Sequence, residues 1–123
     1  MKPIMVIRDP EAIQLLADET RRKMVFLLRV KEMTVAQIAE ELNLTPQAVY
    51  HHVKKLLDGG MIEVVREERV GHLIESYYTT TADTFVYYTD QMNESDTQAF
   101  LAVLSGLNEL GHGVELNEEN ARS

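Results

Sequence analysis

One stretch of the chain carries amide, aromatic and cationic side chains at a spacing that suits contact with DNA. A helix turns by about 100° per residue, which places four polar residues on one face: Gln47, His51, Lys54 and Asp58. Tyr50 and Lys55 lie at the flanks of that face. Glutamine pairs bidentately with adenine, lysine reaches guanine or phosphate, and tyrosine and histidine donate to phosphate. The same pattern also occurs on solvated helix surfaces, so its meaning depends on the elements that hold the face.

Two helix-start signals separated by a very short turn define those elements. Thr34 and Gln37 form a capping-box pattern, which starts a helix that ends at Asn43. Thr45 and Pro46 start the next helix, and Asn43 tolerates the left-handed conformation that a sharp turn requires. This arrangement predicts a helix-turn-helix motif. An ordinary pair of packed helices in an α bundle is the alternative.

The sequence after the second helix changes from helical to strand periodicity. β-Branched and aromatic residues predict two strands joined across a polar tip at residues 66–72, which contains Gly71. A hairpin in this position is a wing. The predicted fold is therefore mainly α with a small β-hairpin wing, a winged helix-turn-helix plus a C-terminal helix.

The DNA contacts are expected at the start of the second helix and at the wing. The N-terminal residues of a recognition helix lie deepest in the major groove. In the wing, Arg69 is preferred because it is nearest the Gly71 turn, whereas Glu67 and Glu68 would repel DNA. The complete predicted DNA-binding set is Thr45, Gln47, Ala48, Tyr50, His51, Lys54, Lys55, Arg66, Arg69 and His72.

The segments that flank the motif predict further elements. An extended segment at Ile4 to Ile7 precedes two helices between about residues 10 and 30, which Asp9 and Asp18 would cap. Residues 83–91 fit either a strand or a helix. No local signal resolves that choice.

A C-terminal helix is expected at about residues 96–110, after the capping-box pattern of Ser95 and Gln98. Its apolar stripe exceeds what so small a core needs to bury, which predicts dimerisation; packing on its own domain is the alternative. We therefore expect a winged-helix domain at 1–82 and a C-terminal segment at 83–123 with an acidic tail. The predicted dimerisation residues are Phe100, Val103, Leu104, Leu107 and Leu110.

The net charge of −8 opposes DNA binding in bulk, but the charge is unevenly distributed. Residues 1–75 hold 11 Lys and Arg against 12 acids, whereas residues 76–123 hold only Arg122 against 8 acids. Such asymmetry is expected when one part approaches a polyanion and another is held away. An acidic tail that serves only as solubilising surface explains the same distribution.

The sequence lacks the residues that several classes of functional site require. The absence of cysteine excludes disulfides, thiolate zinc sites and cysteine nucleophiles. Adjacent His51 and His52 would make a poor chelate, and His52 is expected to flank the core. No nucleophile–base pair, phosphate-binding glycine loop or metal-ligand spacing is present, so no enzyme, metal or cofactor is expected. With no signal peptide or membrane-span run, a cytoplasmic location is expected.

The chain resembles the ArsR-type winged-helix regulators, especially archaeal members, over roughly residues 9 to 85. The stretches that carry the resemblance are ADETRRKMVFLLRVKEMTVAQIAEELNLTPQAVYHHVKKLLDGGMIEV and YYTTTADTF. It implies dimeric DNA-binding repressors or regulators, with Gln47, Tyr50, His51 and Lys54 on the recognition helix. Metal-sensing members carry Cys-x-Cys in the first helix of the motif, where residues 35–39 here have no thiol. The resemblance therefore does not imply metal sensing for this chain.

These patterns together predict a sequence-specific double-stranded DNA-binding transcriptional regulator, acting as a dimeric repressor. An unidentified small-molecule effector is left open. A winged helix used for protein–protein or RNA contacts is the alternative, which the overall acidity favours.

Overall fold

The computed structural model describes residues 2–87, Ser95, Gln98, Ala102 and 114–116. The chain divides into two compact units. One comprises Leu15–Thr81, and the other comprises Met1–Gln14 together with Ala82–Ser123.

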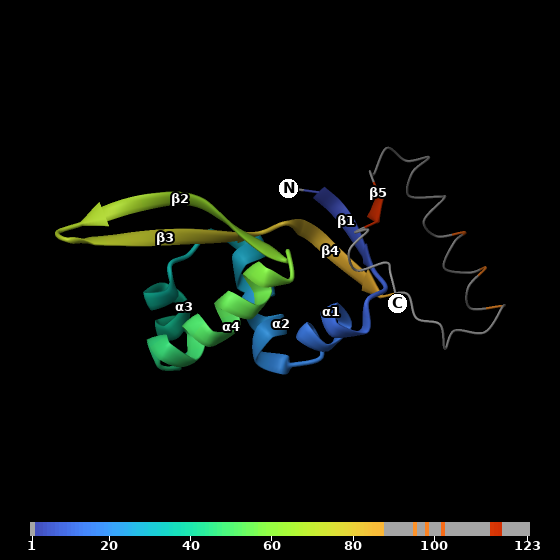
Figure 1. The fold of residues 1–123 in the computed structure, drawn as a ribbon, viewed down its shortest axis with the longest axis horizontal. Coiled ribbons are helices and arrows are strands. Elements are labelled where there is room, and N and C mark those ends of the chain that lie inside the picture. Colours follow the sequence, from blue (N-terminus) through green and yellow to red (C-terminus); the bar gives the residue numbers. More distant parts are fainter. Residues whose placement is uncertain (1, 88–94, 96–97, 99–101, 103–113, 117–123) are drawn as a thin grey trace. The chain divides into compact units, whose positions relative to one another are not determined.

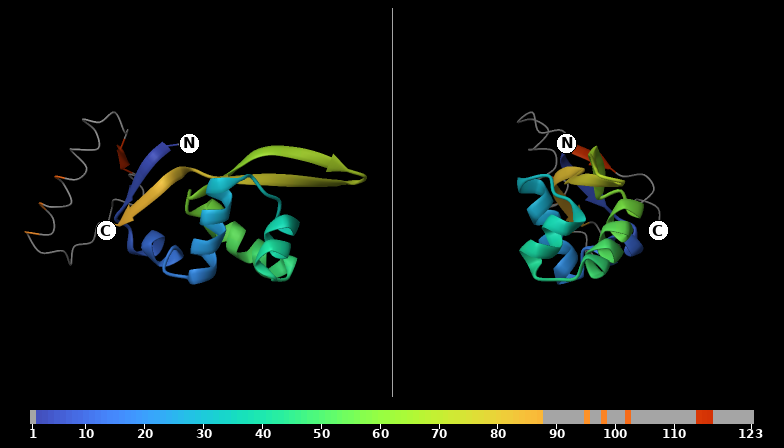
Figure 2. Two further views of the ribbon diagram at one scale, coloured as in Figure 1. Left: turned by 180° about the vertical axis from the view of Figure 1, so that it is seen from behind. Right: turned by 90° about the vertical axis from the view of Figure 1, so that its left-hand side faces the viewer.

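The unit at residues 15–81 contains three helices followed by a hairpin. Its elements in chain order are α2 (Glu19–Val30), α3 (Val35–Leu42), α4 (Pro46–Asp58), β2 (Ile62–Val70) and β3 (Leu73–Thr80). The hairpin extends beyond α3 and α4 in Figure 1 and in the reverse view of Figure 2. This order confirms the winged helix-turn-helix predicted from the sequence.

Side-chain caps fix where the helices of this unit begin. Asp18 Oδ1 accepts a hydrogen bond from the Arg21 backbone N–H at 3.0 Å, at the start of α2. Thr34 and Gln37 satisfy each other's backbone N–H groups at 3.0 and 3.2 Å, which confirms the capping box of α3. Asn43 ends α3 with φ of 54°, so the turn adopts the expected left-handed conformation.

The core of this unit lies between the inner faces of the helices and the base of the hairpin. Its most deeply buried side chains come from all three helices and from both strands or the residues beside them. They are Met24, Leu28, Ile38, Val49, Val53, Leu56, Met61, Ile62 and Thr80. Because α3 and α4 bury their apolar stripes here, their polar faces remain outside.

The strands of the wing are longer than the sequence predicted. A polar tip was expected at residues 66–72, but β2 runs to Val70, β3 begins at Leu73, and only Gly71 and His72 form the turn. Gly71 has φ of 64°, which a type II′ hairpin turn requires at its first central residue. Strand pairing uses backbone groups, so charged side chains extend the ladder without an apolar pattern.

The other unit contains a parallel sheet that the sequence did not reveal. β1 (Lys2–Ile7) pairs with β4 (Ala82–Tyr87) on one side and with β5 (Val114–Leu116) on the other. The short helix α1 (Pro10–Leu15) follows β1, so the extended segment and the two N-terminal helices are confirmed. Within the segment 83–91, for which the sequence fits either a strand or a helix, residues 83–87 form a strand and residues 88–91 lie outside the described residues.

The proposed C-terminal helix falls almost wholly outside the described residues. So do its five predicted dimerisation residues Phe100, Val103, Leu104, Leu107 and Leu110. The boundary predicted at residue 82 also stays a prediction, although residues 1–14 group with 82–123. Within the described part of the chain, every helix is too short or too polar to cross a membrane.

Candidate nucleic-acid interface

The helix α4 separates a buried apolar face from an exposed polar one. Val49, Val53 and Leu56 have no exposed surface. The side chains of the opposite face and its flanks are exposed, and among them 56% of Tyr50 is accessible. They are Gln47, Tyr50, His51, Lys54 and Lys55, which we call the recognition face. Because the inward stripe fixes the rotation of the helix, this face is presented as a unit.

The start of α4 leaves polar groups accessible at the end expected to lie deepest in a groove. Thr45 is exposed, and its Oγ1 accepts from the Ala48 N–H at 3.2 Å. The hydroxyl hydrogen of Thr45 can still donate to an acceptor. Ala48 is half-buried and Gln47 is exposed. The geometry therefore suits contact with base edges or a thymine methyl group.

The middle of α4 is tied to the start of α2. The Arg21 Nε donates to the Leu15 carbonyl at 2.5 Å, and Arg21 Nη1 lies 3.3 Å from His52 Nδ1. His52 is half-buried beside the core, and burial lowers the pKa of its imidazole, with Asp18 opposing that shift. The expected position of His52 at the edge of the core is confirmed.

Arg66, in the middle of β2, lies in a cluster of carboxylate and aromatic side chains. Its Nε lies 2.5 Å from Glu32 Oε1, its Nη1 lies 3.2 Å from Glu68 Oε2, and its guanidinium stacks 3.6 Å from the Tyr77 ring centroid. The hydrogen bond to Glu32 raises the pKa of Arg66 above its ordinary value. Two carboxylates thus neutralise this cation locally. The sequence could not reveal this, because Glu32 is 34 positions away.

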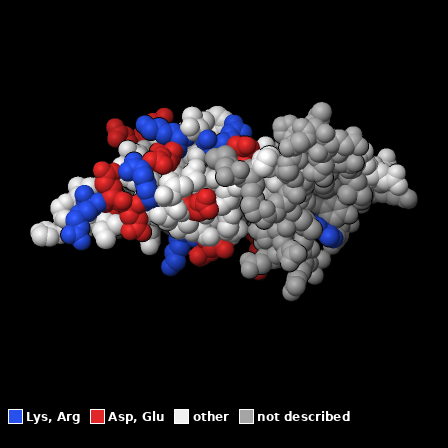
Figure 3. Space-filling model, turned by 90° about the horizontal axis from the view of Figure 1, so that it is seen from above, with Lys and Arg blue, Asp and Glu red and all other residues white. Residues whose placement is uncertain are grey.

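The outer wing carries Arg69 and His72, which are both exposed near the turn. Within the described residues, Arg69, Lys54 and Lys55 form no ion pair. The visible surface in Figure 3 mixes basic and acidic side chains, without one continuous basic area among the described residues. The hairpin strands hold two arginines against four glutamates, at positions 63, 67, 68 and 75. The wing is therefore locally acidic except near its tip.

A hollow of about 460 Å³ lies between the recognition helix α4 and the wing. It lies where the starts of α3 and α4 face β3 and combines apolar walls with hydroxyl groups and one carboxylate. Its lining residues are Thr34, Val35, Ala36, Pro46, Tyr50, Ile74, Glu75, Ser76 and Tyr78. Sequence reasoning missed this feature, because it forms only where distant elements meet.

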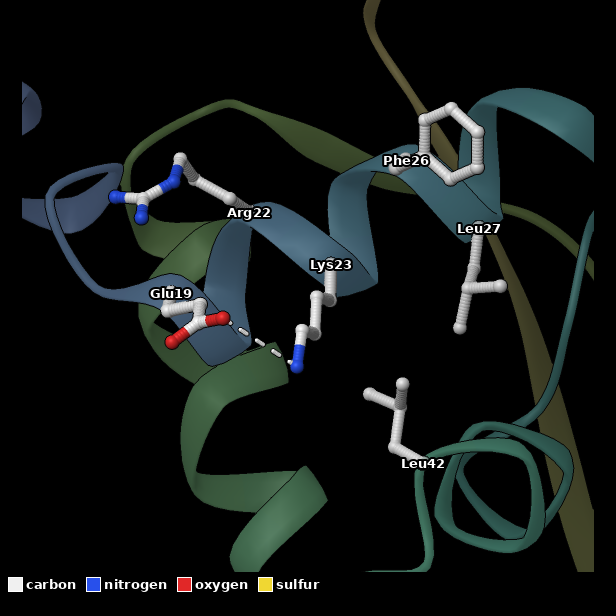
Figure 4. A pocket seen from close by; sticks show the side chains of 6 residues that line it. All are labelled: Glu19, Arg22, Lys23, Phe26, Leu27 and Leu42. Atoms are coloured by element: carbon white, nitrogen blue, oxygen red, sulfur yellow. Dashed lines mark ion pairs between the residues drawn. The ribbon is translucent and has the colours of Figure 1, made fainter.

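A second hollow, of about 420 Å³, lies between α2 and the end of α3. Figure 4 shows Leu27 and Lys23 of α2 pointing towards Leu42 of α3. Lys23 forms an exposed ion pair with Glu19 at 3.5 Å. None of the residues that line this hollow belongs to the recognition face.

The residues present do not fit the thiolate metal site of metal-sensing ArsR-type proteins. The chain has no cysteine, and α3 presents no thiol, imidazole or other soft ligand over Val35–Leu42. In the described part of the chain, His, Asp and Glu side chains form no group of three or more that could hold a metal ion. We derive no metal-dependent step for this protein.

Comparison with known proteins places this geometry in a family. A family model described as a helix-turn-helix domain matches residues 16–65. The chain is 31% identical to the transcriptional repressor SdpR of Bacillus subtilis (strain 168) over 83 residues, which cover 66% of this chain and 89% of SdpR.

Solved structures show weaker similarity. NolR from Sinorhizobium fredii is 20% identical with a TM-score of 0.49, over 79% of this chain and 80% of that chain. A homodimeric winged helix-turn-helix DNA-binding domain from Mycobacterium bovis is 21% identical with a TM-score of 0.48, over 80% of this chain and 77% of that chain. The family assignment therefore rests on SdpR and on the family model. The chain belongs to the ArsR-type winged helix-turn-helix transcriptional regulators.

Proposed function

We propose that this regulator binds specific double-stranded DNA sequences through α4 and represses transcription as a homodimer. The observation that supports it most strongly is the exposed recognition face opposite a fully buried apolar stripe. A helix that is fixed in rotation and exposes amide, imidazole and ammonium groups matches what the major groove reads.

The residues of the interface divide by role. Thr45, Gln47 and Ala48 contact base edges, because they occupy the start of the recognition helix. Tyr50, His51, Lys54 and Lys55 bind phosphates and set the register of the helix. At the wing, Arg69 and His72 approach the minor groove, whereas Arg66 contributes less because Glu32 and Glu68 already pair with it.

Dimerisation and repression extend the proposal beyond the winged helix itself. The apolar stripe at about residues 96–110 would pair two copies, and two recognition helices about 34 Å apart would then read a palindromic site. SdpR is named a repressor. We further propose that the protein acts in the cytoplasm and catalyses no reaction. A small-molecule effector of unidentified chemistry is also part of the proposal.

Fluorescence anisotropy tests the function directly. The full-length protein is titrated into a labelled duplex from upstream of its own gene and into a scrambled duplex, over a series of salt concentrations. We expect tighter binding to the upstream duplex and a steep loss of affinity with salt, from which the phosphate contacts are counted. Equal affinity for the two duplexes would contradict sequence-specific recognition.

One observation favours the alternative function, a protein or RNA interaction module. The wing holds four glutamates against two arginines, an unfavourable charge for approach to duplex DNA. The same titration with a labelled single-stranded RNA separates the two functions. RNA binding tighter than binding to both duplexes would support the module and contradict the repressor.

A further inference from the structure

We propose that His52 is a positioning residue for the recognition helix, which Arg21 holds in its DNA-binding orientation only while the imidazole is neutral. This inference rests on the proposed function, because its effect is measured on DNA affinity. It adds a pH-sensitive contact that lies behind the recognition face.

The contact joins the start of α2 to the middle of α4. The Arg21 guanidinium donates to the Leu15 carbonyl through Nε at 2.5 Å and meets His52 Nδ1 through Nη1 at 3.3 Å. The backbone N–H of the same residue donates to Asp18 at 3.0 Å. Arg21 is thus fixed at its own helix start while it reaches α4. We call Arg21 and His52 the clasp.

The protonation state of His52 decides whether the clasp can form. A neutral imidazole protonated at Nε2 has a lone pair at Nδ1, which accepts from the guanidinium. An imidazolium carries N–H donors at both nitrogens and has no acceptor. Protonation therefore replaces a hydrogen bond with two cations that face each other, and the clasp opens.

The groups around His52 favour the neutral form near pH 7. Burial is the largest cause that lowers the pKa of His52, and the cations Arg21 and Lys55, together with the neighbouring His51 ring, act in the same direction. The Asp18 carboxylate opposes this shift, and it also caps α2. Acidification below the ordinary histidine range would then protonate His52 against these cations.

The clasp lies directly behind groups assigned to DNA. The His51 ring meets the His52 ring edge-on at a centroid distance of 5.6 Å and belongs to the recognition face. Lys55 is one helical turn after His51 on α4. A displacement of α4 at His52 would therefore move both groups relative to the phosphates that they contact.

The test compares the pH profile of DNA binding for the parent protein with two variants. His52→Gln keeps an acceptor for Arg21 but does not titrate, whereas His52→Leu removes the acceptor. Anisotropy with the upstream duplex is measured at constant ionic strength from pH 7.5 to pH 5.5. The other three histidines, His51, His72 and His112, are the same in all three proteins, so differences between the profiles isolate His52.

We expect His52→Gln to bind within about twofold of the parent at pH 7.5 and to lose about three- to tenfold less affinity on acidification. His52→Leu should bind more weakly than the parent at pH 7.5 and should share the flatter profile. Coincident profiles for the parent and His52→Gln would overturn the proposal. Parent-like affinity of a folded His52→Leu at pH 7.5 would also overturn it.

A measurement without DNA separates this inference from the proposed function. In an NMR titration of the free protein, the α4 backbone amides around His52 and the Arg21 Nε–H should shift together with the His52 ring. If the Arg21 and α4 chemical shifts stay constant while the His52 ring titrates, the clasp is contradicted. Absence of DNA binding by all three proteins would reject the proposed function, and the NMR result would then decide the clasp alone.

Discussion

The recognition helix and the wing carry cations of the same kind in opposite electrostatic settings. Lys54 and Lys55 lie on the exposed side of α4, and within the described residues they form no ion pair. Arg66 on the wing meets two carboxylates and an aromatic ring. The contrast teaches that basic residues of similar exposure differ in local neutralisation, and we expect those that the fold has not neutralised to contribute more to DNA affinity.

The largest effect is expected from the buried side of α4, which holds the recognition face in place. Leu56→Ala should lower the free energy of unfolding by about 2–5 kcal/mol, because it leaves a cavity at a fully buried position. Urea denaturation measures this change. The exposed variant Lys54→Ala is the matched control and should stay within about 0.5 kcal/mol of the parent. Equal destabilisation by both variants would contradict the two-faced helix.

A smaller but more selective effect is expected from the start of α4. Gln47→Ala should cost about 1–3 kcal/mol of discrimination at particular base pairs, because a bidentate amide contact is lost. Anisotropy against duplexes with single base-pair changes measures this loss. A uniform weakening over all duplexes would place Gln47 on the backbone instead.

Lys54→Ala should weaken binding to every duplex about tenfold and lower the slope of log affinity against log salt by about 0.9. The lysine is expected to neutralise one phosphate and to read no base. An unchanged slope with intact folding would remove Lys54 from the interface.

The wing provides the sharpest paired comparison. Arg69→Ala should lower the slope of log affinity against log salt by up to about 0.9, the value for one phosphate contact. Arg66→Ala should leave this slope nearly unchanged. Both arginines lie on β2, but Arg69 is near the turn and forms no ion pair among the described residues, whereas Arg66 is paired with two carboxylates and lies mid-strand. A greater loss for Arg66→Ala would reverse our assignment of the two roles.

The smallest effect concerns stability in acid. The native pKa of His52 is lowered by burial, so the unfolded chain binds a proton before the native state as the pH falls below the ordinary histidine value. Stability should therefore fall from neutral pH towards the native pKa of His52. Thermal unfolding measures this slope, which His52→Gln should flatten.

A second decrease is expected at lower pH from the cap of α2. The backbone hydrogen bond from Arg21 lowers the pKa of Asp18, so the capped carboxylate contributes stability above its ordinary pKa. That contribution is lost as the pH falls through the native pKa. Asp18→Asn should retain a cap but remove this second decrease.

The sequence predicted those parts of the fold that local chemistry determines. Thr34 with Gln37, Asn43 and Thr45 each act within a few residues, and each forms the cap or turn expected of it. The exposed and buried faces of α4 follow equally from a local repeat. DNA contact by the recognition face remains a prediction.

The features that the sequence did not predict depend on residues far apart in the chain. The pairing of β1 with β4 joins Ile4 to Thr84, and no local periodicity specifies such a parallel partner. The pairing of Arg66 with Glu32 and the hollow beside Tyr50 likewise need the assembled hairpin. The wing strands exceeded their predicted length because backbone pairing tolerates charged side chains.

The most direct test of the central claim is amide chemical-shift mapping of the full-length protein with the unlabelled upstream duplex. We predict the largest shifts at residues 45–55 of the recognition helix, smaller shifts at residues 69–72, and little change around the hollow lined by Leu27 and Leu42. Binding that leaves residues 45–55 unshifted would contradict the account, because the face that we assign to DNA would then not meet it.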